Sequence, residues 1–441
     1  MQRVLSFEQT PPLSVPLRFF LTAPLFALAA ALLLLWHGPS ALASRWSPIT
    51  LALTHLMTLG FLAMCMIGAL LQMLPVVASI EIPHSRVTSG AVHGLLVLGT
   101  LALVNGFLLN FSLLFKVAML LLLMAFAWLL LIGLRGVWSS TNDNPMLLTI
   151  RFALAALVVT VGLGLTAASA FTWPLGLPLM QITDIHAAWG LLGWVGLLVV
   201  GVAYQVVPMF QVTPLYPRRI TQWLAKAIFL VLVLWSAITI ATLKRPGAWS
   251  VMLAALAAGA YVLFSAATFY LLWQRKRPKP DATTMFWCVA LTSLFGCATL
   301  WITGVFFPNI SNTPAYPLAM GIMFIVGFGY SVVNGMLYKI VPFLVWYHLQ
   351  NQLAGGCTKA PNVKQVLPDR QAENQFRLHL LALSLLLVST IYPQWLAQLA
   401  ALAFAASSAW LWLNLVKAAH VYRRMAPSEP TAKEAPAVQG K

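Results

Sequence analysis

The stretch GALLQMLP, Gly68–Pro75, decides the fold because its pattern of residues occurs three times in the chain. The pattern G-x-x-x-[QK]-x-x-P returns as GVAYQVVP at Gly201–Pro208 and as GMLYKIVP at Gly335–Pro342. The two intervals between the copies differ by a single residue, and one more glycine lies eight residues before each copy, at Gly60, Gly193 and Gly327. Such regular spacing indicates an internal repeat.

The composition indicates an integral membrane protein. Of the 441 residues, 61% are hydrophobic and only 8% are charged, which excludes an ordinary soluble domain. Apolar runs of about 18 residues or more recur along the chain, and each is long enough to cross the hydrocarbon core of a bilayer as a helix. Because lipid offers no hydrogen bonds to the backbone, we expect these runs to be helices that contact the bilayer directly.

The apolar runs predict twelve spans in a single membrane domain, 1–425, followed by a disordered tail, 426–441. The repeated pattern falls on the second, sixth and tenth spans. We therefore expect three pseudo-equivalent four-helix units at about 18–134, 148–273 and 284–420, with one long loop at about 349–376. The expected spans lie near 18–36, 48–78, 90–109, 114–134, 148–171, 184–211, 220–242, 249–273, 284–307, 316–346, 378–393 and 395–419.

The basic residues predict the orientation of the chain. Only four of the 26 lysines and arginines fall on one side of the twelve-span arrangement, namely Arg45, Lys116, Lys244 and Arg245. The positive-inside rule then places both termini in the cytoplasm of a bacterium, with the protein in the inner membrane. The net charge of +17 is explained by this topology and by contact with anionic lipids, so we expect no nucleic-acid partner.

Two histidines inside apolar segments are candidate cofactor ligands. Counted back from the proline of each copy, His186 lies only two positions further from Pro208 than His55 lies from Pro75, so both sit at a similar outer depth. Ionisable groups inside a membrane are costly and are functional candidates by default. The difference of two residues is about 200° around a helix. The two side chains therefore leave equivalent helices from nearly opposite faces, which allows them either to converge between the second and sixth spans or to point apart.

Other polar residues carry weaker predictions. His93 and His379 lie just inside the third and eleventh spans, on the same side, and are weak candidates for a second heme or metal. We interpret Asp184 mainly as a helix cap, with a contact to an imidazole as the alternative. Counting back from Pro342 leads to Met320 and Ile322. Met320 is a weak candidate ligand, because methionine can bind heme iron.

The stretch HLMTLGFLAMCMIGALLQMLP, His55–Pro75, resembles the second span of heme-copper oxidase subunit I and of NnrS-type membrane proteins, which respond to nitric oxide. Twelve helices in three four-helix arcs, with ligand histidines near the outer ends of spans 2, 6 and 10, also resemble that superfamily. The resemblance implies that His55 and His186 converge and bind a b-type heme, since imidazole is an ordinary axial ligand for heme iron.

The oxygen-reducing copper site of that superfamily has no counterpart in this sequence. Oxygen-reducing members hold this copper with histidines of the sixth and seventh spans and also need histidines on the tenth, whereas the seventh span here has none and the tenth has none before His348. We therefore expect no oxygen reduction and predict no catalytic residue. Copper remains an alternative metal because Met57, Met64, Met66 and Met73 supply soft thioethers on the second span.

The sequence thus predicts a heme-binding membrane protein in electron transfer or in the handling or sensing of nitric oxide. Its expected partner is an electron donor or a subunit of a respiratory chain. Two alternatives stay open: a membrane transporter of metal or heme, and an accessory subunit without a cofactor.

Overall fold

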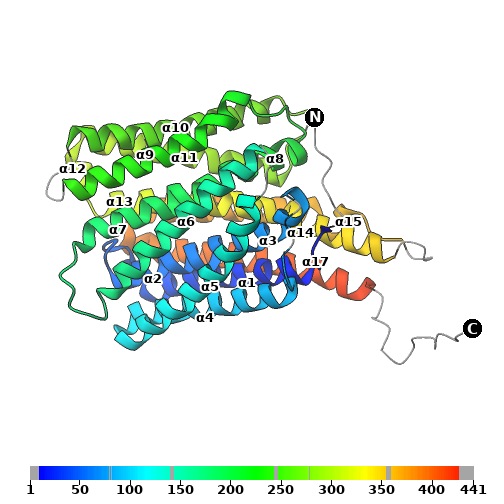
Figure 1. Ribbon diagram of the computed structural model, residues 1–441, viewed down its shortest axis with the longest axis horizontal. Coiled ribbons are helices and arrows are strands. Elements are labelled where there is room, and N and C mark those ends of the chain that lie inside the picture. Colours follow the sequence, from blue (N-terminus) through cyan, green and yellow to red (C-terminus); the bar gives the residue numbers. More distant parts are fainter. Residues whose placement is uncertain are drawn as a thin grey trace, which may run out of the picture.

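The described part of the chain is built from helices. The computed structural model describes residues 9–78, 80, 82–139, 144–242, 247–277, 279–353 and 359–426. Within these ranges every regular element is a helix, and the long helices lie side by side along the long axis of the molecule (Figure 1). The predicted all-α membrane fold is therefore confirmed. The expected tail beyond residue 426, and Lys244 and Arg245, lie outside the described residues.

In chain order the described helices fall into three groups, each of which contains one copy of the repeated pattern. The first unit holds α1 (Ser14–His37), the 3-10 helix η2 (Gly38–Leu42), the continuous segment α2, η3 and α3 (Pro48–His55, Leu56–Ala63, Met64–Ala78), α4 (Ser85–Leu109) and α5 (Ser112–Ser139). The second holds α6 (Pro145–Ser169), the segment α7, η4 and α8 (Leu179–Ala188, Trp189–Gly196, Leu197–Gln211), α9 (Arg218–Ala241) and α10 (Ala248–Trp273). The third holds α11 (Ala282–Phe306), α12 (Pro308–Ser311), the segment α13, η5 and α14 (Ala315–Ile322, Met323–Tyr330, Ser331–Gln352), α15 (Val363–Val366), α16 (Asp369–Ser389) and α17 (Pro393–Met425).

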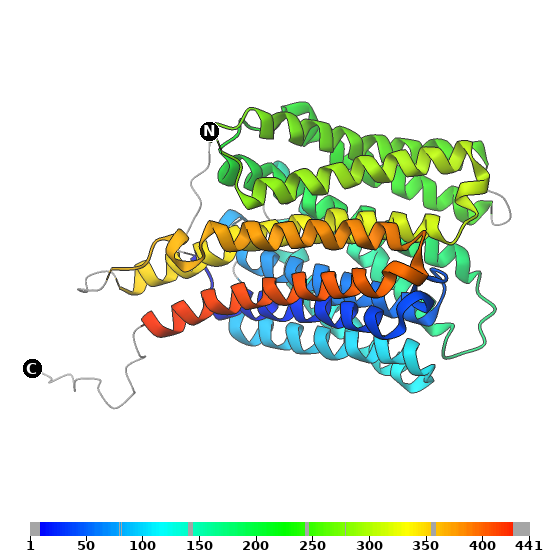
Figure 2. The ribbon, with the colours of Figure 1, turned by 180° about the vertical axis from the view of Figure 1, so that it is seen from behind.

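Eleven helical segments of the described chain are long and apolar enough to cross a membrane. The remaining expected span, the eleventh in chain order, lies in α16, which begins at Asp369 instead of near residue 378 and whose polar first turns leave it outside this set. Much of the loop expected at 349–376 is therefore helical. It contains the end of α14, which extends to Gln352, all of α15, and the first turns of α16. Figure 2 shows α16 running alongside the other long helices in the orange part of the ribbon.

Each of the three central segments contains a π-helix at the same place in its unit. The π-helices are η3 (Leu56–Ala63), η4 (Trp189–Gly196) and η5 (Met323–Tyr330), and each is eight residues long. Their first residues are separated by the same two intervals as the copies of the GALLQMLP pattern. The sequence repeat therefore corresponds to a repeat of local backbone structure.

Repeated glycines allow close packing within each unit. A Cβ atom on Gly60, Gly193 or Gly327 would lie within 3 Å of Phe26, Ala156 or Ser293, on the first helix of the same unit. A Cβ on the next glycine, Gly68, Gly201 or Gly335, would meet the residue seven positions earlier on that helix: Phe19, Thr149 or Phe286. Only glycine permits this approach of neighbouring backbones.

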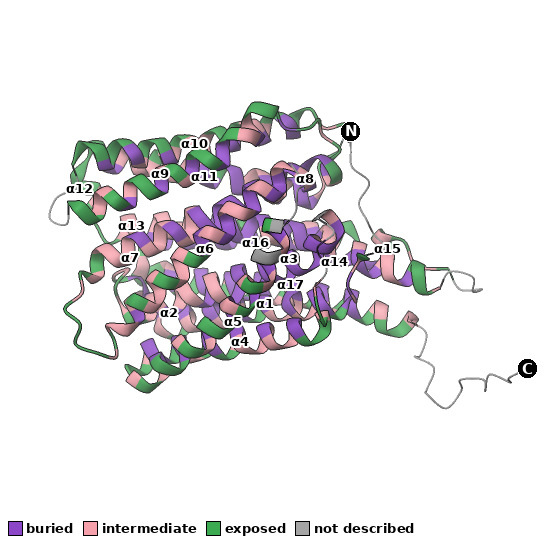
Figure 3. Cartoon of the chain, viewed as in Figure 1, coloured by how far each residue is buried: buried purple, intermediate pink, exposed green. Residues whose placement is uncertain are grey.

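The three central segments line most of an apolar pocket of about 70 Å³, which Phe20 of α1 and Trp287 of α11 complete. Five positions of α3 line it, and the positions that correspond to them in the repeat line it from α8 and α14. For example, Cys65, Leu198 and Val332 are such a triplet. Two of the central segments are also the most buried spans of the described chain: 83% of the apolar window in Pro48–Val77 and 72% of that in Leu179–Gln211 are buried, against 22% in Arg218–Ala241 (Figure 3). The pseudo-equivalent helices thus meet around a common axis.

The outer surface is apolar, as contact with a bilayer requires. Large exposed side chains on the peripheral helices include Leu98, Leu120, Leu131, Trp249 and Leu263. Such extended apolar exposure is rare on soluble proteins and marks a membrane-facing surface. The described chain therefore belongs to a multi-pass membrane protein that contacts lipid.

Candidate functional site

The structure brings His55 and His186 together between the second and sixth spans. His55 ends α2 and His186 lies in α7, just before the π-helices η3 and η4. Their ring centroids are 6.4 Å apart and the ring planes differ by 21°. Of the two arrangements that the register allowed, the structure contains the converging one.

Hydrogen bonds determine which nitrogen of each ring carries the proton. Nδ1 of His55 lies 2.8 Å from the carbonyl oxygen of Leu51, and Nδ1 of His186 lies 3.0 Å from that of Thr160. Because a carbonyl oxygen can only accept, each Nδ1 is the donor. Each Nε2 then carries a lone pair. This is the arrangement in which a backbone carbonyl orients a metal-binding histidine.

The separation of the rings matches two imidazoles on opposite sides of one metal ion. With about 2 Å from metal to nitrogen and roughly 1.2 Å from nitrogen to ring centre, two such rings have centroids about 6 Å apart. The observed 6.4 Å agrees with this value. The centroid separation of the pair therefore equals that of two imidazoles that share one metal ion.

Neighbouring residues fix the positions of both rings. The ring of Phe107, on α4, stacks on His55 at 5.4 Å, and Phe107 in turn contacts Phe115 and Phe171. On the other side, a Cβ on Gly164 of α6 would lie 3.0 Å from Cε1 of His186, so the imidazole lies directly on the helix backbone. The site is bounded by aromatic rings on one side and by a bare helix surface on the other.

An ion pair joins the connection before α2 to α7 at the outer side of the histidines. Nη2 of Arg45 lies 2.8 Å from Oδ1 of Asp184. The prediction that Asp184 caps a helix was wrong: α7 begins after Pro178, so Asp184 lies within the helix. The carboxylate of Asp184 instead pairs with the guanidinium of Arg45, which lies ten residues before His55 in the sequence.

His93 and His379 occupy corresponding places in different units. Nε2 of His93 lies 2.9 Å from Oγ1 of Thr22, and its ring contacts Phe19. His379 lies 2.7 Å from Oγ of Ser331 and its ring contacts Phe286, the counterpart of Phe19. Each histidine thus has neighbours in its own unit, and within the described residues no ring contact or hydrogen bond joins the two.

Met320 is the counterpart of His186 in the third unit. Its carbonyl oxygen lies 3.9 Å from Sγ of Cys297 on α11, at the place where His186 meets Thr160 on α6 in the second unit. No hydrogen bond links Met320 to the histidine pair in the described part of the chain. Likewise, no three His, Cys, Asp or Glu side chains gather as a metal site among the described residues.

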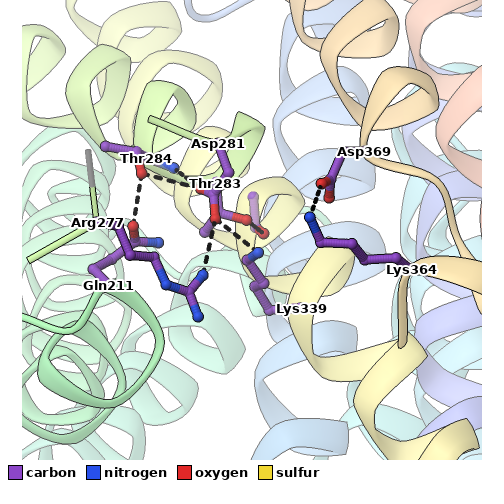
Figure 4. Close-up of polar contacts among 9 residues, drawn as sticks. Gln211, Arg277, Asp281, Thr283, Thr284, Lys339, Lys364 and Asp369 are labelled. Atoms are coloured by element: carbon purple, nitrogen blue, oxygen red, sulfur yellow. Dashed lines mark hydrogen bonds and ion pairs between the residues drawn. The ribbon is translucent and has the colours of Figure 1, made fainter. Parts of the chain in front are cut away.

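One polar cluster was missed by the sequence analysis. Lys339, which replaces the glutamine of the repeated pattern, lies 2.7 Å from Oδ2 of Asp281 (Figure 4). Asp281 also caps α11 through the backbone N–H of Thr284, whose hydroxyl donates to Gln211 of α8 at 2.6 Å. Lys339 itself was the sequence signal for this cluster, because a half-buried lysine requires an acidic side chain nearby.

Comparison with protein-family models and with curated proteins yields no match for this chain.

Proposed function

We propose that this protein binds one b-type heme between His55 and His186 and transfers electrons within the membrane. The observation that carries the proposal is the pair of nearly parallel imidazoles 6.4 Å apart, both oriented by backbone carbonyls. Heme bound there would supply a one-electron redox centre. His55 and His186 would hold its iron, and Phe107 would hold the His55 ring in place.

The small number of ligands favours heme over a bare metal ion. Transition metals in proteins usually take three or four protein ligands. Here two imidazoles converge, and within the described residues no third His, Cys, Asp or Glu joins them. A porphyrin supplies four nitrogens of its own and requires only two axial ligands from the protein. A copper ion held by the same pair is the alternative that metal analysis distinguishes.

Heme held by both His55 and His186 would supply electron transfer rather than gas binding, because a gas would have to displace one of the two imidazoles. We place the protein in the heme-copper oxidase-like superfamily, in a bacterial inner membrane with cytoplasmic termini. Its partner would be an electron donor or another subunit of a respiratory chain.

An optical spectrum of the purified protein tests this proposal. Protein expressed with ample heme should show a Soret band and a reduced-minus-oxidised spectrum of b-type heme. His55→Ala and His186→Ala should each lose most of the heme, while His37→Ala, at the end of α1, should keep it. Absence of a Soret band contradicts the proposal, and heme that survives both alanine variants shows that the ligands are others.

A pair of glycine variants on α6 tests the position of the His186 ring. Gly164→Leu should displace the imidazole, because even a Cβ there lies 3.0 Å from Cε1, and should reduce heme content at least tenfold. Gly162→Leu is the matched control, since a Cβ at that position meets nothing within 4 Å. Equal heme content in the two variants would show that the cofactor does not depend on this ring.

A further inference from the structure

The second unit carries a group of basic residues at the end of α9 and α10 that is remote from the histidine pair. One part of the group lies at the start of α9 and the other in the connection from α10 to α11. We call it the basic patch; it consists of Arg218, Arg219, Lys226, Arg275, Lys276, Arg277 and Lys279. All of these side chains are exposed except that of Arg275, which is half-buried.

Three hydrogen bonds hold the two parts of the basic patch together. They tie the segment 211–216, before α9, to α10, to the connection after α10 and to α11. The bonded pairs are Tyr216 with Thr268 at 2.9 Å, Val212 with Lys276 at 3.1 Å, and Gln211 with Thr284 at 2.6 Å, the last of which is drawn in Figure 4. The cations at the start of α9 and those after α10 therefore gather at one corner of the molecule.

Almost no acidic residue balances the charge of the basic patch. The sequence of α8, α9, α10 and the connections between them contains no Asp or Glu. Asp281 lies 2.7 Å from Lys339 and only 3.8 Å from Arg277, so its carboxylate is engaged mainly with the lysine (Figure 4). Asp369, drawn in the same view, pairs with Lys364 at 2.9 Å. The patch is therefore a concentration of positive charge without an equivalent of carboxylates.

Two features of the basic patch call for a bound anion. α9 begins after Pro217 without a side-chain cap and with no acidic residue in its first turn, so Arg218 and Arg219 stand at the positive end of the helix dipole. Independently, Nε of Arg275 is buried and has no acceptor within the described residues. An anionic oxygen offsets the dipole and accepts from guanidinium groups, which bind phosphate with good geometry.

Exposed aromatic residues place the basic patch at the surface of the bilayer. Trp223 and Trp273 are 64% and 79% exposed, and tryptophan is enriched where the hydrocarbon meets the headgroups. Nζ of Lys226 lies 4.8 Å from the centre of the Trp223 ring, so a cation of the patch lies at this level. Further along α9, Leu230 and Leu234 are exposed and apolar. This combination fits a lipid, with its phosphate at the patch and its acyl chains along α9.

The other two units show that the fold does not require such a patch. The corresponding helix of the first unit, α4, has one arginine, Arg86, in its first turn, and that of the third unit, α16, has Asp369 beside Arg370. The positive-inside rule requires a surplus of cations on one side of the membrane but not their concentration in one unit. The concentration in the second unit therefore needs a local explanation.

We propose that the basic patch binds an anionic phospholipid. The phosphate lies between the start of α9 and the connection after α10, where Arg218, Arg219 and Arg275 donate to its oxygens. The patch selects an anionic lipid over a zwitterionic one, because the ammonium group of a zwitterionic headgroup is repelled by the surrounding cations. The lipid fastens α9, the least buried of the eleven candidate spans, to its neighbour α10. The proposal does not depend on heme at the His55–His186 pair.

Thermal unfolding in lipid nanodiscs tests this site. Replacing part of the phosphatidylcholine with phosphatidylglycerol should raise the Tm of the wild-type protein, because a ligand that binds the folded state stabilises it. Arg218→Gln combined with Arg219→Gln should lose most of this rise. Arg423→Gln combined with Arg424→Gln is the matched control, since this adjacent and exposed arginine pair lies in the last turn of α17, and it should keep the rise.

Three results in nanodiscs would overturn the proposal. The first is a wild-type Tm that phosphatidylglycerol does not raise. The second is a rise of equal size in both double variants, which is a general effect of membrane charge. The third is an equal rise when inorganic phosphate is added to phosphatidylcholine nanodiscs, which identifies a site for a free anion.

Native mass spectrometry tests the other half of the basic patch. Wild-type protein released from micelles that contain phosphatidylglycerol should retain bound lipid. Lys276→Gln combined with Lys279→Gln should retain about tenfold less, because both exposed lysines adjoin the phosphate. The control with Arg423→Gln and Arg424→Gln should retain as much as the wild-type protein. Equal retention by all three proteins would overturn the proposal.

Discussion

Lys339 replaces the glutamine of the repeated pattern, and a second replacement at a facing position supplies its partner. Its counterparts are Gln72 and Gln205, and the cap that faces it, Asp281, corresponds to Asn144 at the start of α6 in the second unit. The third unit therefore has an Asp–Lys pair where the second has Asn and Gln. Both charged side chains are 19% exposed, so the charges are only partly screened by solvent.

A double-mutant cycle measures this pair. Asp281→Asn leaves Lys339 without its carboxylate, and Lys339→Gln removes the closest cation beside Asp281. Each single variant should lower the free energy of unfolding by about 1–2 kcal/mol, as expected for a half-buried ion pair. The double variant, which reproduces the pair of the second unit, should regain most of the loss. Additive losses in a thermal or denaturant titration would contradict the coupling.

The same pair predicts a loss of stability in acid. Burial raises the pKa of the Asp281 carboxyl, but the hydrogen bond and charge of Lys339 and the hydrogen bonds from Thr284 outweigh it, so the pKa lies below its usual value. A lowered pKa contributes stability above the unfolded value of about 3.9, and this contribution is lost as the pH falls through the folded value. Below about pH 4 the wild-type protein should therefore lose Tm relative to the double variant. Parallel pH profiles would contradict this assignment.

At the scale of single elements, the glycines of the π-helices control the packing inside each unit. Gly60→Ala should be the most destabilising alanine variant of the three, because its Cβ would lie 2.4–2.6 Å from three atoms of Phe26, whereas at Gly327 only Oγ of Ser293 is that close. Gly193→Ala should be the mildest, with its nearest atom at 2.9 Å. Overpacking of this kind costs about 1–3 kcal/mol, measurable as a drop in Tm.

Gly321→Ala, in α13, is the matched control for these glycine variants. A Cβ there meets nothing within 4 Å, so alanine should keep or slightly raise Tm. If Gly60→Ala and Gly321→Ala had the same Tm, the close approach of α1 and η3 would not be rigid.

The placement of His55 and His186 on nearly opposite faces could be anticipated from sequence because both segments contain a π-helix of the same length. Each segment has one eight-residue π-helix between its histidine and its proline. The extra rotation is therefore the same in both segments and the two-residue difference in register is kept, although counting alone allows the side chains either to converge or to point apart. The residue count from each proline back to its histidine therefore gave the correct relative orientation, although neither segment is a regular α-helix throughout.

Other local features could not be predicted because their signal is spatial. Nothing in LMTLGFLA distinguishes a π-helix from an α-helix, since glycines and apolar residues suit both. The pairing of Arg45 with Asp184, far apart in the sequence, depends on which faces meet between two spans. The polar first half of α16 has too low a hydropathy to be read as a span, although it continues the same helix.

At the scale of the whole molecule, the start of α1 and the ends of α14 and α17 lie together. His348 contacts the carbonyl oxygen of Pro11, and Gln352 donates to the hydroxyl of Tyr422. If this end faces the cytoplasm, green fluorescent protein fused after Met425 should fluoresce. Alkaline phosphatase fused after Gly176, between α6 and α7, should be active because that connection lies at the opposite end. The reverse pair of results would contradict the predicted orientation.

The cavity on the common axis determines how the molecule responds to hydrostatic pressure. The volume decrease on unfolding grows with the empty space that unfolding removes, and the apolar space of about 70 Å³ on this axis adds to it. Because the three central segments all line this void, compression acts first where the units meet and not within any one of them. The bundle should therefore yield under pressure along its axis, as three units that separate from one another.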